Sequence, residues 1–361
     1  MNSGLRLAAR SMLAATVCMG AAVFLGAEQA IAAPVAIAPY TLTTFNGVPP
    51  GGATQPDDLA ISADGKDLWV GYGNGVATDG SGGPSSLVEY DISTGAVLKN
   101  ISIPGHLDGL KINPFSGDIW ATENEDANPT LAIVDEDSGA SKISTFSTSS
   151  ITGGLDDLVF GSDTGNPFVV ASSQSDTTKP VIIQLSRKPK STITSVQSVV
   201  GGAPATVFNV VTGATETGDQ IGDPDSMTLD PAGELVLDNR SDDSLYIVRS
   251  PSATNPVLRV PLKLGGVPVE VNDTIFTKSA TTLEASTAGT IFITDTTANK
   301  IYELTKPYFS PNEVYTAANV VKDVGLVDLN TGIVTPVVTG FQGVHGLAFA
   351  PTLVEIAEPG N

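Results

Sequence analysis

The chain has 361 residues and a formal net charge of −21 at pH 7, although charged residues make up only 16% of it. An acidic surface of this kind repels nucleic acid and anionic membranes, and it attracts cations. The 37 glycines and 24 prolines, together with plentiful Val, Thr and Ser, are typical of short strands and tight turns and exclude a mainly helical or disordered chain.

Residues 1–32 have the features of a secretory signal peptide. Arg6 and Arg10 give a positive start, residues 12–26 form an apolar run, and Ala30-Ile31-Ala32 is a small-x-small cleavage site. The apolar run is short for a membrane span and no stop-transfer pattern follows it. We therefore expect an exported bacterial protein, periplasmic or extracellular, without a membrane span after cleavage.

The only cysteine, Cys18, lies inside this segment. The mature chain would thus have no disulfide and no thiolate chemistry. Residues 33–361 are then expected to form a single domain.

A short strand is predicted at residues 39–45, where the sequence YTLTTF alternates between polar and apolar residues. It has no partner upstream. In a closed ring of sheets the first strand often completes the last sheet, which hides both sheet edges. We therefore expect residues 40–45 to form the outer strand of the sheet that begins at His345.

The organising unit of the chain is best seen at residues 222–248, GDPDSMTLDPAGELVLDNRSDDSLYIV. Three apolar segments alternate there with turn sequences, among them Asp230-Pro231-Ala232-Gly233, and they predict three antiparallel strands. The same pattern starts six times along the chain, and its start position is held by Asp57, Asp108, Asp156, Asp225, Thr281 and His345.

These starts recur roughly every 50 to 70 residues, whereas a four-stranded propeller blade takes about 40 to 50. The sequence therefore predicts an all-β, six-bladed β-propeller with loop insertions. Residues 305–339 contain three further strand-like segments without a start motif, so seven blades remain the alternative. Large aromatic side chains are expected to pack between blades: Trp69, Trp120, Phe160, Tyr246 and Phe292.

The repeat sequences PDDLAIS, LDGLKINP, PDSMTLDPAGELVLDN and GTIFITDTTANKIYEL resemble those of six-bladed propellers of the NHL and SMP-30/gluconolactonase type, which are grouped with YVTN-like and virginiamycin B lyase-like repeats. The resemblance covers nearly the whole mature chain. It implies either a lactonase, with a divalent metal held at the channel mouth by a Glu, two Asn and an Asp, or a lyase that uses His with Mg²⁺. Here Asp57-Asp58 stands at the first start in place of Glu, and Val344-His345-Gly346 matches the Pro-His-Gly starts of the lyases.

The start positions are candidate ligands for a cation. The innermost strand of each blade lines the channel, so equivalent residues form a ring around it. Crowded carboxylates raise one another's pKa unless a cation neutralises them, and hard oxygen ligands suit Ca²⁺ or Mg²⁺. The predicted metal set is Asp57, Asp108, Asp156, Asp225 and His345. Alternatively, each Asp accepts backbone N–H bonds at the start of its own strand.

The chain has only two histidines, His106 and His345, and both lie at strand starts. They are candidates for a catalytic base or a metal ligand. Alternatively, each bonds a backbone carbonyl at a blade edge.

No serine nucleophile elbow, phosphate-binding loop, CxxC or HExxH motif occurs, so we expect no nucleotide or organic cofactor. Two classes of function remain. The first is a monomeric binding scaffold that recognises a small molecule, a glycan or an envelope protein. The second is a metal-dependent lactonase-like or lyase-like enzyme with its site at the channel mouth.

The signal sequence generates a direct prediction. The exported protein should begin near Ala33, because cleavage is expected after Ala30-Ile31-Ala32. Amino-terminal sequencing of the protein recovered outside the cytoplasm checks this. Recovery of an intact Met1 would show that the segment is not removed.

Overall fold

The computed structural model describes residues 32–145, 153–161, 167–171, 180–187, 193–201, 206–218, 221–249, 254, 256–277 and 288–352. The expected signal segment, with Arg6, Arg10 and Cys18, lies outside these ranges, and so does Thr281. The described residues form strands β1 to β29 and one short 3-10 helix, η1 (Arg240–Asp242). None of this part of the chain forms a helix long and apolar enough to cross a membrane.

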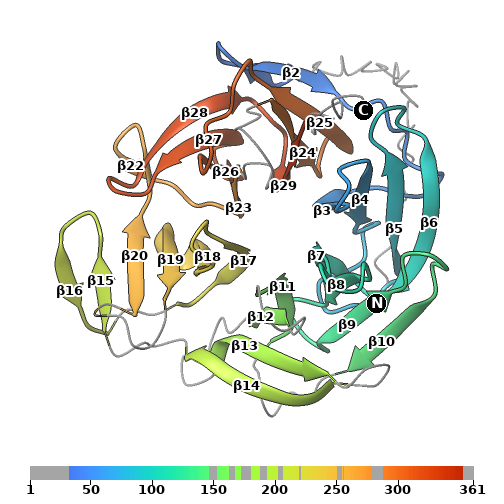
Figure 1. Ribbon diagram of the computed structural model, residues 1–361, viewed down its shortest axis with the longest axis horizontal. Coiled ribbons are helices and arrows are strands. Elements are labelled where there is room, and N and C mark those ends of the chain that lie inside the picture. Colours follow the sequence, from blue (N-terminus) through green and yellow to red (C-terminus); the bar gives the residue numbers. More distant parts are fainter. Residues whose placement is uncertain are drawn as a thin grey trace, which may run out of the picture. The chain divides into compact units, whose positions relative to one another are not determined.

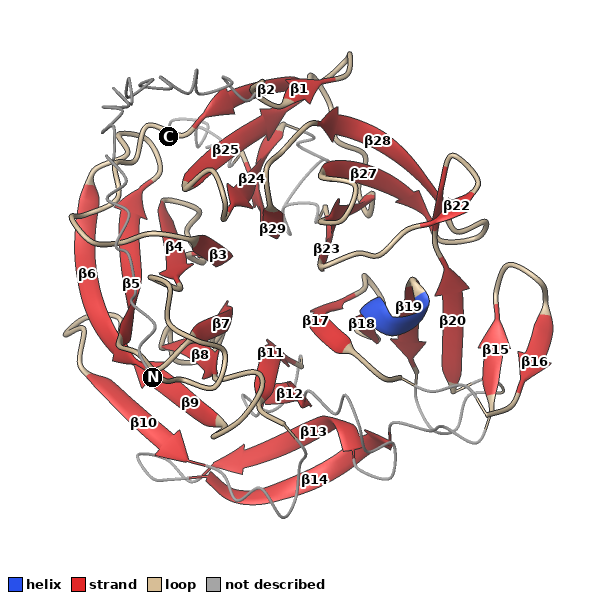
Figure 2. Ribbon diagram, turned by 180° about the vertical axis from the view of Figure 1, so that it is seen from behind, coloured by secondary structure: helices blue, strands red, loops and turns tan. Residues whose placement is uncertain are grey.

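The described strands form six sheets arranged around a central channel (Figures 1 and 2), which confirms the prediction of an all-β propeller. Sheet 1 contains β3 (Pro56–Ile61), β4 (Asp67–Tyr72), β5 (Pro84–Asp91) and β6 (Val97–Pro104). Sheet 2 contains β7 (Leu107–Ile112), β8 (Ile119–Glu123), β9 (Thr130–Val134) and β10 (Ser141–Thr145). Sheet 3 contains β11 (Leu155–Phe160), β12 (Pro167–Ala171), β13 (Pro180–Arg187) and β14 (Ile193–Gly201). In these three sheets the strands run from the channel outwards in chain order.

Sheet 4 has a core of β17 (Pro224–Leu229), β18 (Leu235–Asn239), β19 (Ser244–Val248) and β20 (Val257–Pro261). An inserted hairpin extends its outer edge and consists of β15 (Val207–Asn209) and β16 (Ala214–Glu216). Strand β15 pairs with β20 in parallel, so the insertion covers an edge that would otherwise be open.

Sheet 5 has a core of β23 (Asp273–Phe276), β26 (Val314–Ala318), β27 (Asp323–Asp328) and β28 (Ile333–Thr339). Its outer edge is extended by β21 (Lys263–Leu264), β22 (Val267–Pro268) and β1 (Val35–Ala36). Sheet 6 consists of β29 (Val344–Pro351), β24 (Gly289–Asp295), β25 (Lys300–Thr305) and β2 (Thr41–Thr44). The inner strands contact one another in the closed order β3, β7, β11, β17, β23, β29 and again β3.

The last two sheets are interlaced along the chain. After β23, the inner strand of sheet 5, the chain forms β24 and β25 of sheet 6. It then returns to sheet 5 for β26, β27 and β28, and ends with β29, the inner strand of sheet 6. The three strand-like segments at 305–339 are therefore the outer strands of sheet 5, whose inner strand comes about 40 residues earlier in the sequence.

The N-terminal strand closes the ring as predicted. Strand β2 pairs with β25, with Thr41 opposite Thr305, and it lies at the outer edge of the sheet that contains β29. Phe45, directly after β2, is buried and contacts the rings of Tyr90 and Phe292 edge-on, with centroid distances of 5.7 Å. Sheet 6 thus combines segments from both ends of the chain.

Local sequence signals explain the turns and the core. At the turn after β17, Asp230 Oδ1 accepts hydrogen bonds from the N–H groups of Ala232 and Glu234, and Gly233 adopts a φ of 82° that favours glycine. The large aromatic side chains named above are buried, as predicted. Trp120 and Phe160, from sheets 2 and 3, meet edge-on at a centroid distance of 5.4 Å.

Closure by β2 has a measurable consequence. Deletion of residues 39–45 should unfold the protein or make it oligomerise, because β25 would become an exposed edge and the core would lose Phe45. Size-exclusion chromatography and thermal melting check this. A monomeric truncated chain with an unchanged melting temperature would show that the strand is not required for closure.

Candidate functional site

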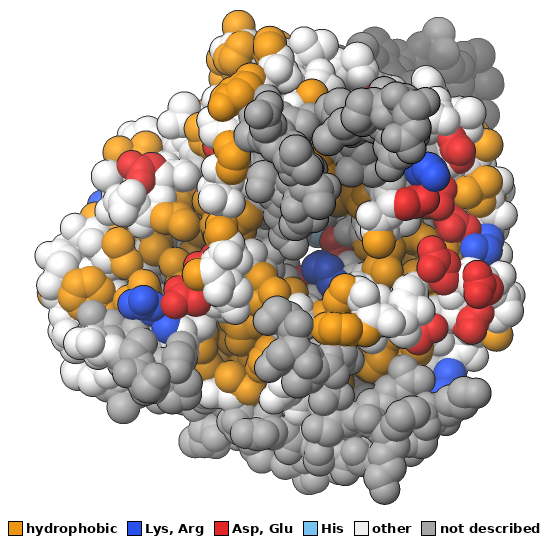
Figure 3. Space-filling view, in the orientation of Figure 1, with side chains coloured by type: hydrophobic (Ala, Val, Ile, Leu, Met, Phe, Trp, Pro, Cys, Tyr) orange, Lys and Arg blue, Asp and Glu red, His pale blue; other side chains and the backbone are white. Residues whose placement is uncertain are grey.

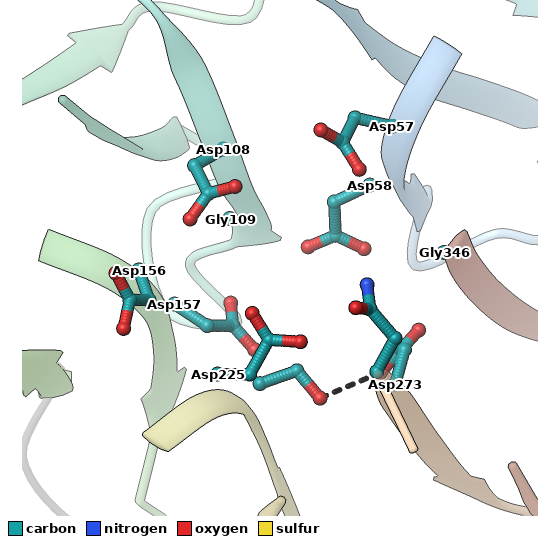
Figure 4. Close-up of a pocket in the computed structure, with 11 residues that line it drawn as sticks. Asp57, Asp58, Asp108, Gly109, Asp156, Asp157, Asp225, Asp273 and Gly346 are labelled. Atoms are coloured by element: carbon teal, nitrogen blue, oxygen red, sulfur yellow. Dashed lines mark hydrogen bonds between the residues drawn. The ribbon is translucent and has the colours of Figure 1, made fainter. Parts of the chain in front are cut away.

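Each inner strand brings two successive residues to the channel where it starts. The first positions make up the first ring, which consists of Asp57, Asp108, Asp156, Asp225, Asn272 and His345. The second positions make up the second ring, which consists of Asp58, Gly109, Asp157, Ser226, Asp273 and Gly346. Except for His345, these residues surround a narrow neck of about 30 Å³, room for roughly one water molecule (Figure 4).

Five of the six predicted start residues lie together in the first ring, and a different residue holds the sixth place. Thr281 lies outside the described residues, and the remaining place in the ring is held by Asn272, just before β23. The repeat pattern missed Asn272 because the strand that pairs with β23 follows only after two strands of sheet 6. The signal in the sequence was the short run from Val271 to Phe276, in which three polar residues, Asn272 to Thr274, precede two apolar ones.

The aspartates of the second ring connect neighbouring sheets in pairs. Each accepts a hydrogen bond from a backbone N–H on the inner strand of the next sheet: Asp58 from Leu110 at 2.7 Å, Asp157 from Met227 at 2.8 Å, and Asp273 from Leu347 at 2.6 Å. Sheets 1 and 2, 3 and 4, and 5 and 6 are joined in this way. We call these three contacts the aspartate clasps.

The other junctions depend on small residues and hydroxyl groups. Between sheets 2 and 3, a Cβ on Gly109 would lie 2.5 Å from the Cα of Asp157, so only glycine fits. Thr122 accepts a hydrogen bond from the Gly109 N–H and donates to the carbonyl of Asp156. Thr294 and Gly346 repeat this arrangement between sheets 6 and 1.

Lys111 lies between two of the clasping carboxylates. Its Nζ is 2.8 Å from Asp58 Oδ2 and 3.0 Å from Asp157 Oδ1. Burial lowers the pKa of Lys111, but the two carboxylates outweigh this effect and hold the pKa above its usual value, so the ammonium stays charged. Burial raises the pKa of Asp58 to about 6, against the opposing effect of Lys111, and it raises that of Asp273 to about 7.

The alternative role proposed for the first ring, capping of its own strand, is performed by the second ring. Asp58 Oδ1 accepts the N–H of Leu59 and Asp157 Oδ1 accepts that of Leu158, each at 2.7 Å. Asp108, in contrast, has no hydrogen-bond donor among the described residues.

Two groups of side chains, each containing two first-ring aspartates, meet at the channel mouth. Asp108, Asp156 and Glu125, which lies beyond β8, can each offer one oxygen within 4.8 Å of the others. Asp57, Asp108 and the His106 ring form a second such group. Glu125 lies outside the repeat's start positions, and only the ring geometry brings it to the mouth, so the sequence pattern did not reveal it.

Burial and mutual repulsion disfavour the ionised form of these carboxyls. Burial raises the pKa of Asp108 well above its usual value, and Glu125 and the neighbouring first-ring carboxylates raise it further. Burial also raises the pKa of Asp225, although the Arg240 guanidinium opposes the shift. The pKa of Glu125 is raised by burial and then by Asp57. Additional positive charge at the mouth would therefore favour ionisation of the whole group.

His345 lies beside Asp57 at the mouth. Its Nδ1 lies 3.1 Å from Asp57 Oδ1, and Asn272 and Asn319 place amide nitrogens 3.2 Å and 3.4 Å from its two ring nitrogens. Burial lowers the pKa of His345, but Asp57 and Asp225 together outweigh burial and the net pKa is raised. The contact with Asp57 therefore favours protonation of the ring, whereas amide N–H groups directed at the ring nitrogens favour its neutral form.

His106 differs because its ring is oriented by a carbonyl. Its Nδ1 lies 2.9 Å from the carbonyl oxygen of Val76, which only accepts hydrogen bonds, so Nδ1 carries the proton. In the neutral ring the lone pair is therefore on Nε2, which lies 4.0 Å from Glu125 Oε1 at the mouth. His106 can therefore bond a backbone carbonyl, as the alternative proposed, and still act as a base or metal ligand.

A cavity of about 360 Å³ lies above the first ring, on the side of η1. The histidines, Asp57, Asp108, Glu125 and Asp225 line part of it, and Arg240 lines another part. Arg240 Nε bonds Glu270 at 2.9 Å, and its Nη1 is 3.9 Å from Asp225. The mouth therefore combines many carboxylates with one guanidinium and is large enough for a small organic molecule.

The glycine junction can be tested by one substitution. Gly109→Ala should cost about 1–3 kcal/mol of stability, because the new methyl group overlaps the Asp157 backbone. Urea denaturation measures the cost. Gly51→Ala is the matched control: no atom lies within 4 Å of its Cβ position, and a change within about 0.5 kcal/mol is expected. Equal costs for the two variants would contradict the close approach of sheets 2 and 3.

No protein-family model and no curated protein matches this sequence. Several solved structures are similar to it in overall chain course. A virginiamycin B lyase from Staphylococcus aureus is 13% identical, with 86% of this chain and 96% of that chain covered and a TM-score of 0.45. A streptogramin B lyase is 15% identical, with coverage of 86% and 95% and a TM-score of 0.46. An auxiliary nutrient binding protein from Bacteroides ovatus is 11% identical, with coverage of 85% and 69% and a TM-score of 0.49.

Proposed function

We propose that the chain is an exported binding scaffold, a closed six-bladed propeller that takes its ligand at the acidic mouth of the channel. The gathering of carboxylates from different inner strands around a cavity of about 360 Å³ carries this proposal. Its partner would be a small molecule, a glycan or an envelope protein, and the protein would act as a monomer. The strongly acidic chain argues against nucleic acid as a ligand.

The six-bladed form is supported by the contacts of the inner strands. These strands succeed one another without a gap, from β3 through to β29 and back to β3. The seven-bladed alternative assigned residues 305–339 to an additional blade, whereas β26 pairs with β23, and β27 and β28 follow it in sheet 5. Each of the six sheets then has one inner strand at the channel.

The ligand at the mouth includes a divalent cation, Ca²⁺ or Mg²⁺. Asp108, Glu125 and Asp156 offer only oxygen atoms, which are the ligands that both ions prefer. These carboxyls are crowded and at least half-buried, so a cation would favour the ionised form that their environment otherwise disfavours. Asp57 and the Nε2 atom of His106 would add to this set, and Asp225 and His345 would remain beside it.

A metal-dependent lactonase-like or lyase-like enzyme is the second candidate. The orientation of His106 favours it, because the lone pair on Nε2 faces the cavity and could accept a proton from a substrate. His345, held by Asp57, would stabilise developing negative charge. A bound cation would polarise a carbonyl oxygen of the substrate.

Cation binding should be measurable without any substrate. Isothermal titration calorimetry of Ca²⁺ or Mg²⁺ into chelator-treated protein should show a saturable site. A hundredfold excess over Kd should stabilise the fold by about 2.7 kcal/mol, since the cation binds only the folded chain. The double variant Asp108→Asn with Asp156→Asn should lose both effects. The control is Asp137→Asn, at an exposed position in the β9–β10 turn, which should keep them.

The same variants separate binding from a structural role. Without cation, the double variant should be at least as stable as the parent protein, because it removes buried like charges. If both aspartates instead capped their strands, the variant would lose roughly 0.5–2 kcal/mol for each cap, with or without cation. A melting temperature that responds to neither ion over a wide concentration range would exclude the cation site.

A further inference from the structure

The opposite end of the channel has different chemistry. There the last residues of the inner strands enclose a second cavity of about 320 Å³, which we call the vestibule. In Figure 3, hydrophobic side chains gather around the central hollow of this face and a basic side chain lies within it. The vestibule lies beyond the second ring, on the far side from the acidic mouth.

The wall of the vestibule is mainly apolar. Ile61, Ile112, Leu229 and Phe349 line it and are only half-buried, so the ring of sheets leaves part of their apolar surface uncovered. Burying such surface against a ligand is favourable. A volume of about 320 Å³ is at the lower end of the range for small-molecule pockets.

Lys111 gives the vestibule one polar end. Two of the three N–H groups of its ammonium are directed at Asp58 and Asp157, as described above. The side chain is 25% exposed and borders the vestibule but neither the neck nor the acidic mouth. Its third N–H is therefore available to an acceptor in the vestibule.

The charges at this end select the kind of ligand. The ammonium of Lys111 is already paired with the carboxylates of Asp58 and Asp157, and Asp273 also lines the vestibule, so this end offers no excess positive charge to an anionic ligand. The neck admits about one water molecule, so a ligand cannot pass from one mouth to the other. The enclosure by six strands favours a small molecule over a protein surface.

We propose that the vestibule is a second binding site, for a small neutral apolar molecule with one hydrogen-bond acceptor, such as a carbonyl group, directed at Lys111. The site is independent of the acidic mouth and of any cation there.

The neutral naphthyl ketone prodan is a suitable probe, because its emission shifts to shorter wavelength in apolar surroundings. Titration of the full mature chain should give saturable binding at one site. Thr228, which lines the vestibule, provides the variants. Thr228→Trp should fill the space and weaken binding at least tenfold, whereas Thr228→Ala should bind within about twofold of the parent protein. Thr78→Trp, at the acidic mouth, should bind prodan normally.

Two further measurements complete the test. Dimethylaminonaphthalene, which lacks the ketone, should bind about tenfold more weakly, and equal binding would overturn the role of Lys111. If circular dichroism shows that Thr228→Trp is unfolded, Ile112→Phe is measured in its place. Non-saturable binding, or equal loss in the Thr228→Trp and Thr78→Trp variants, would overturn the vestibule site and leave the cation site unaffected.

Discussion

The channel depends on the ion pairs between Lys111 and the carboxylates of Asp58 and Asp157. A buried carboxylate is costly unless it is paired and hydrogen-bonded, and here one ammonium serves two of them. The same two carboxylates also accept hydrogen bonds from backbone N–H groups of neighbouring strands. One lysine thus makes it possible for acidic side chains to join sheets at the centre of the ring. The first ring lies one residue away along each strand, so its spacing follows from these contacts.

The alternation of aspartate with glycine or serine in the second ring has a steric origin. The glycines leave room at junctions that have no clasp: a Cβ on Gly109 would meet Asp157 of the next sheet, and a Cβ on Gly346 would meet Asp57 and Asp58. Two aspartates in adjacent sheets would compete for that space and repel each other. The ring therefore repeats in pairs of sheets. The first ring has no such steric constraint, yet it is rich in aspartates. Acidic residues that the fold itself does not require are typical of a functional site.

Much of the fold was predictable because each repeat carries its own local signals. Start residues, turns such as the one at Asp230, and apolar alternation occur in the same order, so the propeller and its closure by residues 40–45 could be inferred. Residues brought together only by the ring could not be inferred from spacing. In the sequence, Lys111 looks like an ordinary strand residue, and only the fold brings it close to Asp58. Asn272 was missed for another reason, since its partner strand belongs to a distant part of the chain.

The interlacing of sheets 5 and 6 bears on how the molecule reaches its native state. In sheets 1 to 3 each strand pairs with one made just before it, so these sheets can form as the chain emerges. Sheet 6 needs β2 from one end of the chain, β24 and β25 from its later part, and β29 from the other end. Pairings between such distant segments raise the contact order and slow folding, because loop-closure entropy is lost before the contacts form. The order of synthesis thus makes ring closure the final event, and until β29 arrives the inner edge of β24 is open to other chains.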